Sequence, residues 1–223
     1  MNELIKIEIK KTNLPLHLKG VVIANVILFP LLVAMFLTVP NAQAEALGFI
    51  NTLIKGIFLI WQSILISQLI IDELKTRTLQ HLYTYPLKKS VLMSAKVVLI
   101  SLMMLGFILV TQLIQHSLLS GLSLILPEFS YVMNIESVMV IVLTSIFGVM
   151  VGMLPLAVGL WTKSNIAPVI TAVLILSVFG ATYGEVGTLD LFNNLMVMAS
   201  IGVIGTFMAV FAIKDLLKKD LIV

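Results

Sequence analysis

The sequence predicts an all-α, polytopic membrane protein with six transmembrane helices and both termini in the cytoplasm. Three observations support this class: 60% of the 223 residues are hydrophobic, only 11% are charged, and the mean hydropathy is +1.13. In a soluble domain about a quarter of the residues are charged. A soluble fold could not bury so much apolar surface away from water. The composition therefore excludes a soluble enzyme, a nucleic-acid-binding domain and a disordered chain.

Six apolar stretches have the length that a transmembrane helix needs, about 20 residues. They are too long for the strands of a membrane β-barrel and do not alternate apolar with polar residues. We therefore expect residues 1–223 to form a single transmembrane domain. The predicted spans are about 21–40, 46–71, 91–118, 137–161, 166–183 and 191–213.

The basic residues fall on one side of the predicted membrane. Of the 14 lysines and arginines, all except Lys55 precede the first span, follow the last span, or lie in or beside the loops after spans two and four. The loops on the other side carry only acidic residues among their charges. Because cytoplasmic loops are enriched in lysine and arginine, this side is predicted to be cytoplasmic. The net charge of +3 then reflects topology, and no nucleic-acid partner is expected.

Two polar segments on this side are predicted to be helices outside the hydrocarbon core. Residues 1–19 alternate isoleucine with charged residues, which favours a strand, but a lone strand has no partner there. We prefer an interfacial helix that Pro15 ends or bends. Residues 72–86 place leucine and tyrosine near one helical face, and Asp72 and Glu73 suit a helix N-terminus. The alternative for this second segment is a loop at the lipid headgroups.

The sequence contains no recognisable catalytic pattern. The phosphate-binding pattern G-x-x-x-x-G-K-[ST] and the metalloprotease pattern H-E-x-x-H are absent, and the three histidines belong to different segments. There is no cysteine, hence no disulfide and no thiolate metal site. We therefore expect a non-enzymatic chain with no catalytic residue, no metal site and no cofactor of its own.

Polar side chains within spans two and three form a candidate cavity-lining, substrate-facing set. Its members are Asn51, Lys55, Gln62 and Gln112. Gln115 and His116 lie beside the last of these, and such groups either face a cavity or pair across helices. Two possibilities stay open for Lys55: it lines the cavity, or it extends to the outer headgroups.

Small residues and prolines predict two local features of the later spans. Gly148 and Gly152 permit close helix approach, which we expect within the chain and not at a dimer seam. Pro155 is expected to kink span four. The glycines around Gly180 and Gly184 would let span five break before it reaches the outer surface.

The most specific pattern follows span two. It consists of an acidic pair, a Thr-Leu pair, a leucine and a proline: Asp72-Glu73, Thr78-Leu79, Leu82 and Pro86, running into Ser90 and Lys96. Together with the six spans, this pattern resembles the membrane subunit of ABC-2 type transporters, and the resemblance covers essentially the whole chain. Arg77 stands where the family usually has a glycine.

The resemblance implies partners and roles. Two permease subunits, identical or homologous, would pair in the bilayer, and two copies of a separate ABC ATP-binding subunit would bind ATP and magnesium beneath them. Residues 72–86 would be the cytoplasmic coupling helix, residues 1–19 the elbow helix, and residues 180–191 a re-entrant outer element. The implied ATPase-coupling residues are Asp72, Glu73, Thr78, Leu79, Leu82, Tyr83 and Pro86.

The small size and the absence of an outer domain are similar to bacterial exporters of the peptide, lantibiotic and bacitracin type. The expected protein is therefore a multi-pass subunit of an ATP-driven ABC exporter in the bacterial cell membrane. Its cargo would be amphipathic or antimicrobial peptides, or similar hydrophobic molecules. The alternative is a passive membrane immunity protein that sequesters a peptide toxin without ATP.

Overall fold

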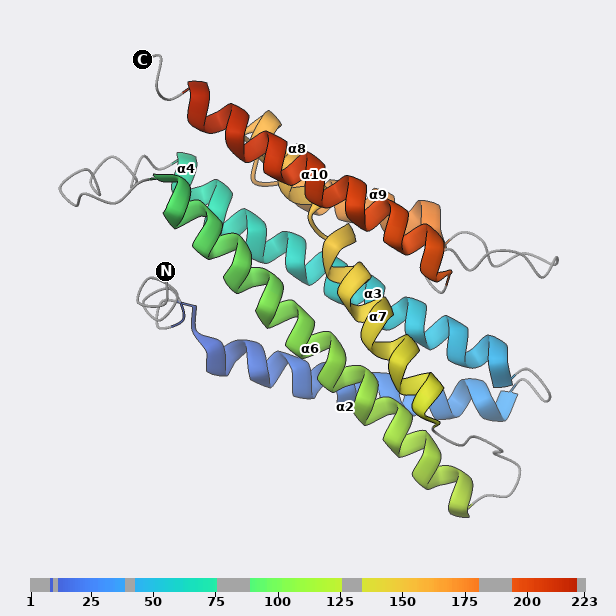
Figure 1. Cartoon of the computed structure of the whole chain (residues 1–223). Helices are drawn as coiled ribbons and strands as arrows, with labels where there is room; N and C mark the ends of the chain where they lie inside the picture. Colours follow the sequence, from blue (N-terminus) through green and yellow to red (C-terminus); the bar gives the residue numbers. More distant parts are fainter. Residues whose placement is uncertain are drawn as a thin grey trace.

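The computed structural model is a bundle of helices (Figure 1) and describes residue 9 and residues 12–38, 43–75, 89–125, 134–180 and 194–219. Every element in these ranges is a helix, so the predicted all-α class is confirmed there. The elements are α2 (Leu14–Thr38), α3 (Gln43–Ile66), the π-helical turn η1 (Ser67–Ile71), α4 (Asp72–Lys75), α6 (Lys89–Ile125), α7 (Ile135–Val151), α8 (Leu154–Thr162), α9 (Ala167–Gly180) and α10 (Leu195–Lys219).

Five helical segments of the described ranges are long and apolar enough to cross a membrane, and they match predicted spans one to four and six. The predicted fifth span contains α9, of which the structure describes 14 residues, Ala167–Gly180. The sixth crossing stays a prediction. Beyond Gly180, the predicted re-entrant element 180–191 lies outside the described residues.

The helix ends fall into two groups at opposite ends of the bundle. Figure 1 shows α4, the starts of α2 and α6 and the end of α10 at one end, which we call the α4 end. The exposed lysines of the described helix termini belong to this group: Lys19, Lys75, Lys163, Lys214 and Lys218. The charge asymmetry that predicts a cytoplasmic side therefore coincides with one end of the bundle.

The first membrane helix starts earlier than predicted. Helix α2 begins at Leu14, and the Asn13 carbonyl oxygen accepts the Leu16 N–H at 2.8 Å. Pro15 lies in the first turn, where its missing N–H removes no helical bond. Pro15 therefore lies at the beginning of the membrane helix, and its predicted role at the end of an elbow helix stays a prediction. Most of the predicted elbow helix, 1–19, lies outside the described residues.

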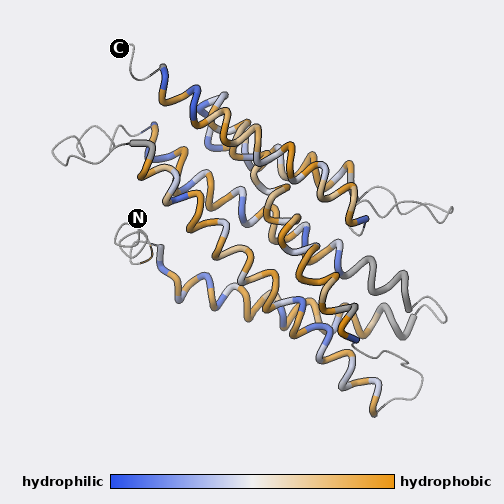
Figure 2. The backbone as a smooth tube through the Cα atoms, in the orientation of Figure 1, coloured by the Kyte–Doolittle hydropathy of each residue, from blue (hydrophilic) through white to orange (hydrophobic). Residues whose placement is uncertain are grey.

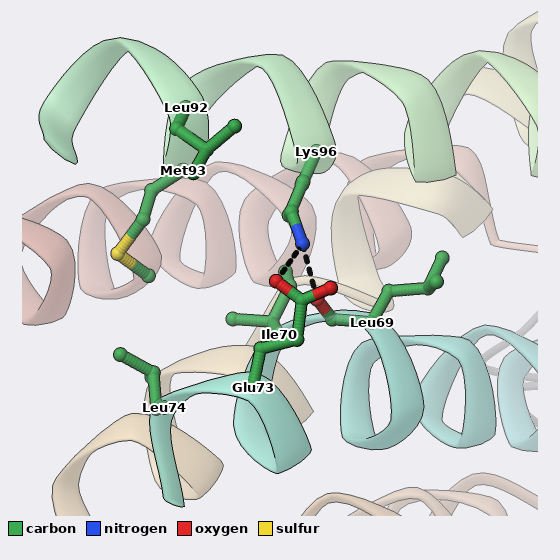
Figure 3. Close-up of a pocket in the computed structure, with 7 residues that line it drawn as sticks. All are labelled: Leu69, Ile70, Glu73, Leu74, Leu92, Met93 and Lys96. Carbon is green, nitrogen blue, oxygen red and sulfur yellow. Dashed lines mark hydrogen bonds and ion pairs between the residues drawn. The ribbon is translucent and has the colours of Figure 1, made fainter. Parts of the chain in front are cut away.

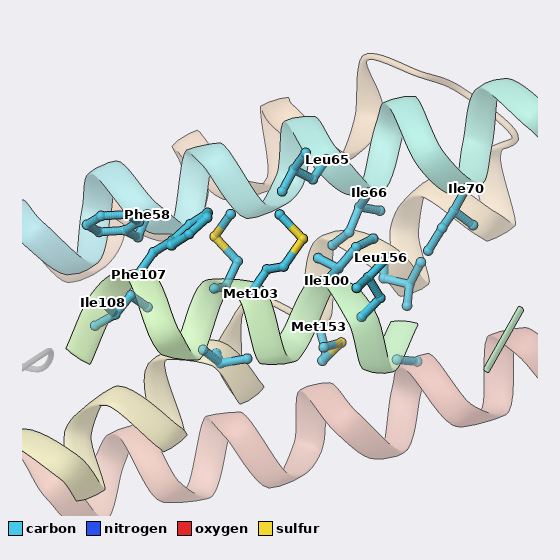
Figure 4. Packing of buried hydrophobic residues seen from close by; sticks show 14 of the residues in the cluster. Phe58, Leu65, Ile66, Ile70, Ile100, Met103, Phe107, Ile108, Met153 and Leu156 are labelled. Atoms are coloured by element: carbon cyan, nitrogen blue, oxygen red, sulfur yellow. The ribbon is translucent and has the colours of Figure 1, made fainter. Parts of the chain in front are cut away.

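The hydrophobic core lies between α3 and α6, with further residues from α2, α8 and α10. Figure 4 shows side chains of α3 facing those of α6 across this layer, with Leu156 of α8 next to Ile100 of α6. Methionines fill the irregular spaces between the branched side chains. Core residues of α3 and α6 include Phe58, Leu65, Met103 and Phe107.

The outward faces of the bundle are apolar as well. Val26 of α2 is 66% exposed and Phe207 of α10 is 73% exposed. Figure 2 shows hydrophobic residues along most of the length of the drawn helices. A soluble protein does not expose apolar surface on this scale, whereas lipid tails solvate it without cost.

Span four is divided between α7 and α8. The break occupies Gly152 and Met153, and Pro155 lies in the first turn of α8. Since proline has no N–H to donate to the preceding turn, the predicted kink at Pro155 is confirmed as a break in the helix. The Gly152 N–H still bonds to the Gly148 carbonyl oxygen at 3.1 Å, which closes the last turn of α7.

Glycines allow α7 to approach both α3 and α10. A Cβ on Gly152 would lie 2.1 Å from Oε1 of Gln62 in α3, and Gly148 faces α10. These two glycines therefore pack within the chain, as predicted. A third close approach was not predicted: a Cβ on Gly202 of α10 would lie 2.9 Å from the Cβ of Met150.

We expect Gly202→Leu to destabilise the protein by about 1–3 kcal/mol, because an overpacked helix contact forces the backbones apart. The new Cβ would also lie 3.2 Å from the Phe147 carbonyl oxygen, which cannot rotate away. The midpoint of denaturation in detergent micelles, followed by the fluorescence of the two tryptophans, measures this change. Gly106→Leu is the control, since nothing lies within 4 Å of a Cβ there. Equal midpoints for the two variants would contradict the close approach of α10 and α7.

Candidate functional site

Polar contacts at the α4 end join η1 and α4 to α6. Lys96 of α6 is 3% exposed, and its Nζ donates to the Leu69 carbonyl oxygen of η1 at 3.0 Å. The same Nζ pairs with the Glu73 carboxylate of α4, as Figure 3 shows. A buried ammonium is tolerated only when a carboxylate or carbonyl compensates its charge. Lys96 therefore holds both η1 and α4 against α6, beside a small recess that Leu74 and Met93 help to line.

A second set of contacts joins the same segment to the turn between α8 and α9. Ser67 Oγ donates to the Asn165 carbonyl oxygen at 2.6 Å, and Asn165 Nδ2 donates to Oδ1 of Asp72. Lys163 ends α8 with a φ of 50°, in the left-handed region. This conformation turns the chain sharply and brings Asn165 back to η1. The segment 67–75 is thus bonded on two sides.

The two acidic residues do not open a separate helix. The Asp72 backbone has φ −59° and ψ −43°, and its N–H donates to the Ser67 carbonyl oxygen, so the helix continues from η1 into α4. The prediction that Asp72 and Glu73 begin a helix is therefore wrong. Their carboxylates bind Asn165 and Lys96, and these tertiary partners explain the charges in place of a helix N-terminus.

Most of the predicted coupling helix lies outside the described residues. Its first turn, Asp72–Lys75, is helical as α4. The helix predicted over 72–86 stays a prediction beyond that turn. The predicted coupling residues that fall outside the described ranges are Thr78, Leu79, Leu82, Tyr83 and Pro86.

A second polar group lies between α3 and α6, within the predicted spans. His116 Nε2 is 3.4 Å from Asn51 Oδ1. Lys55, one turn further along α3, is 3% exposed and interacts electrostatically with His116. Lys55 is therefore enclosed by the helices and does not extend to the outer headgroups. The structure brings Asn51, Lys55 and His116 together, as their shared helical faces suggest.

The two glutamines of the candidate set bind the neighbouring helix α7. Gln62 Nε2 donates to the Val149 carbonyl oxygen at 3.2 Å, and Ser145 Oγ donates to Gln112 Oε1 at 2.9 Å. Both glutamines are 1% exposed. The predicted pairing across helices is therefore observed, and the role of this set in lining a cavity for cargo stays a prediction.

One buried group was missed by the sequence analysis. Asn25 Nδ2 donates to Thr111 Oγ1 at 3.1 Å, and Gln115 Nε2 donates to Asn25 Oδ1 at 3.2 Å. These bonds join α2 to α6. The available signal was that Asn25 carries the only side-chain amide in the apolar stretch 21–40, because an amide within the membrane needs a partner.

The chemistry that these residues offer is hydrogen bonding and charge pairing. Within the described ranges, no three or more His, Asp or Glu side chains form a group that could hold a metal ion. The group between α3 and α6 supplies an ammonium, an imidazole and amides inside an apolar bundle. The α4 end supplies bonds that depend on the position of one short helical segment.

The comparison with known families decides the assignment. A sequence model of ABC-2 family transporter proteins matches residues 4–180, which include both polar groups. The chain belongs to the ABC-2 transporter family. Uncharacterized protein YcbO of Bacillus subtilis (strain 168) is 28% identical over 128 residues, which are 53% of this chain and 53% of YcbO. The chain thus spans about half the length of this curated relative in the match. No solved structure matches the chain.

Membership of the ABC-2 family, together with the five apolar helices, makes the protein a multi-pass integral protein of the cell membrane. The predicted family is therefore confirmed. The assignment does not favour the alternative of a passive immunity protein.

We expect Asn25→Leu to destabilise this ABC-2 family protein by about 1–2 kcal/mol, because it removes the side chain that donates to Thr111 Oγ1 and accepts from Gln115 Nε2. The buried Gln115 amide then keeps only the backbone carbonyl oxygen of residue 25 as its α2 partner. Unfolding in mixed micelles with increasing dodecyl sulfate measures the change. The double variant Asn25→Leu/Gln115→Leu should regain part of the loss, since neither amide then lacks a partner. Thr206→Val is the control, because Thr206 Oγ1 is exposed and bonds only within α10. An Asn25→Leu variant as stable as this control would contradict the prediction.

Proposed function

We propose that the protein is the membrane-spanning subunit of an ATP-driven exporter that moves amphipathic or antimicrobial peptides, or similar hydrophobic cargo, out of the cell. The observation that carries the proposal is the position of α4. This helix leads to the predicted coupling residues and is bonded to both α6 and the α8–α9 turn. A segment bonded on two sides is suited to pass a displacement made outside the membrane into the bundle.

The energy for export would come from partner chains. The sequence has no phosphate-binding loop, and the family implies an ABC ATP-binding subunit. We propose that two copies of this subunit bind ATP and magnesium beneath a pair of permease subunits, identical or homologous. Binding of ATP would bring the two ATPases together and bias the permease pair between two arrangements.

The contact with the ATPase would be made by the predicted coupling helix 72–86. Its apolar side chains, among them Leu79, Leu82 and Tyr83, would enter a groove of the ATP-binding subunit. An amphipathic helix in an apolar groove is a common mode of recognition between protein chains. The α4 end would then face the cytoplasm, in agreement with its exposed lysines.

The cargo would meet the polar side chains between α3 and its neighbours. Asn51, Lys55, Gln62 and Gln112 are polar groups within otherwise apolar helices. In this arrangement Asn51, Gln62 and Gln112 bond to neighbouring helices, and Lys55 is buried beside them. An arrangement that separates α3 from α6 would offer the same groups to a cargo molecule. A surface of this kind suits a molecule with an apolar face and a polar face.

We expect Leu82→Asp/Tyr83→Asp to abolish co-purification of the ATP-binding subunit, because two carboxylates would have to be buried in an apolar groove. Pull-down from mild detergent and ATP hydrolysis in proteoliposomes, with and without a labelled amphipathic peptide, measure the effect. Asn134→Asp adds an exposed charge at the opposite end of the bundle and should leave both readouts unchanged. Unchanged binding and hydrolysis in the double variant would refute the coupling role.

We expect Lys55→Ala to lower uptake of a labelled amphipathic peptide into inverted membrane vesicles by about tenfold or more, because a cargo contact of about 1.4 kcal/mol is lost. Lys55→Arg keeps the charge and should retain more of the uptake. Binding of the ATP-binding subunit should be the same in both variants, since Lys55 lies far along α3 from the α4 end. Wild-type uptake by Lys55→Ala would remove Lys55 from the cargo route.

A further inference from the structure

The π turn η1 (Ser67–Ile71) interrupts an otherwise regular helix directly before α4. The Asp72 N–H donates to the Ser67 carbonyl oxygen five residues back, where an α-helix would bond four residues back, so the turn holds one additional residue. We propose that η1 is a joint that changes register during transport and that Lys96 and Asn165 are the positioning residues that hold its π form. This inference rests on the proposed function and deepens it.

The consequence of a register change follows from helix geometry. If the same residues returned to α-helical bonding, everything beyond η1 would rotate by about 100° about the helix axis. Asp72 and Glu73 directly follow η1 and bind partners on different elements. A single rotation would therefore take both carboxylates away from Asn165 and Lys96 together. The π form and the α form are thus two discrete arrangements, and α4 is bonded to the bundle in the first.

Lys96 stabilises the π form in particular. Its Nζ reaches the Leu69 carbonyl oxygen inside the turn and the Glu73 carboxylate beyond it. An ammonium has three donors, so both bonds are made at once, but only while the turn keeps its present register. Since Lys96 is 3% exposed, loss of these acceptors would leave a poorly compensated charge. A register change in η1 would therefore remove the bonding partners of Lys96 and so alter the packing of α6 against η1.

The other side of η1 is packed closely enough to respond to the same change. A Cβ on Gly159 of α8 would lie 3.2 Å from Cδ1 of Ile71 and 2.6 Å from Cγ of Pro168 in α9. Glycine at this position lets α8, α9 and η1 meet without a gap. Movement of Ile71 would therefore displace the α8–α9 turn, which also loses its bond to Asp72.

Deletion of Gln68 tests the joint directly. The Gln68 side chain is exposed, and removing one residue converts the π turn into α-helix while the helices on both sides keep their orientation. The variant should fold and bind the ATP-binding subunit, because no core contact or charge pair is removed. Because the additional residue of the π turn is gone, this variant should be unable to switch between the π and the α register. We expect it to transport at least about fivefold less labelled amphipathic peptide per ATP hydrolysed than the wild type.

Hydrogen exchange supplies a readout that does not depend on cargo. The wild-type complex with its ATP-binding subunit in lipid nanodiscs should show a change in amide exchange over residues 67–75 when ATP and vanadate are added. The complex of the Gln68 deletion should show no such change. Equal nucleotide-dependent exchange and equal transport per ATP in both complexes would overturn the proposal.

Two further variants keep the test decisive if the deletion does not assemble. Ser94→Ala removes an exposed hydroxyl of α6 that bonds only to the Val91 carbonyl oxygen of the same helix, so transport per ATP should stay within about twofold of wild type. Glu73→Gln/Lys96→Met removes the bond from Lys96 to the Leu69 carbonyl oxygen without leaving an unpaired charge, and should lower transport per ATP at least about fivefold. Equal values for the two variants would also overturn the proposal. A wild-type chain that neither binds an ATP-binding subunit nor transports with ATP would instead overturn the proposed function itself.

Discussion

The structure depends on one constraint: within the membrane, polar groups must find their hydrogen-bond partners inside the protein. Apolar packing alone does not order the helices, because lipid tails are as apolar as the side chains they replace. The directional contacts are the buried polar ones. Asn25 joins α2 to α6, and Gln62 joins α3 to α7. Each of these bonds forms in only one relative position of two helices, so together they fix which helices are neighbours.

The same constraint separates two kinds of polar contact along the bundle. Between α3, α6 and α7 the partners are mostly neutral amides and hydroxyls, which cost little to bury when they are bonded. At the α4 end the partners include carboxylates and a buried ammonium, whose free energy depends strongly on position. Neutral contacts therefore hold the membrane helices together, and charged contacts hold the segment 67–75 at the α4 end. The position of this segment is thus the one most sensitive to the loss of a single partner.

Sequence reasoning predicted the features that depend on composition and local chemistry. Apolar run lengths predicted six spans, and five of them are helices long and apolar enough to cross a membrane. Pro155 predicted the break in span four. Lys55, Gln62 and Gln112 were identified because polar residues are rare in such runs. The family followed from the pattern after span two together with the number of spans.

The features that were missed depend on which helices are neighbours. The pairing of Glu73 with Lys96 crosses 23 positions of the chain, and nothing local to Glu73 indicates it. The preference of acidic residues for helix N-termini led to a wrong prediction for Asp72 and Glu73, because that rule considers only the helix itself. In the structure their carboxylates bind Asn165 and Lys96 on other elements. The π turn could not be predicted because no residue type in it is specific for a π-helix, and its residues also suit an α-helix.

The division of span four into α7 and α8 leaves two helical pieces that meet at Gly152 and Met153. Helix α10 packs against both pieces, and the last turn of α7 closes on its own carbonyl groups before α8 begins. Each piece of span four therefore closes its own hydrogen bonds at the interruption. The relative direction of the two pieces is then set by α10, because it lies along both of them.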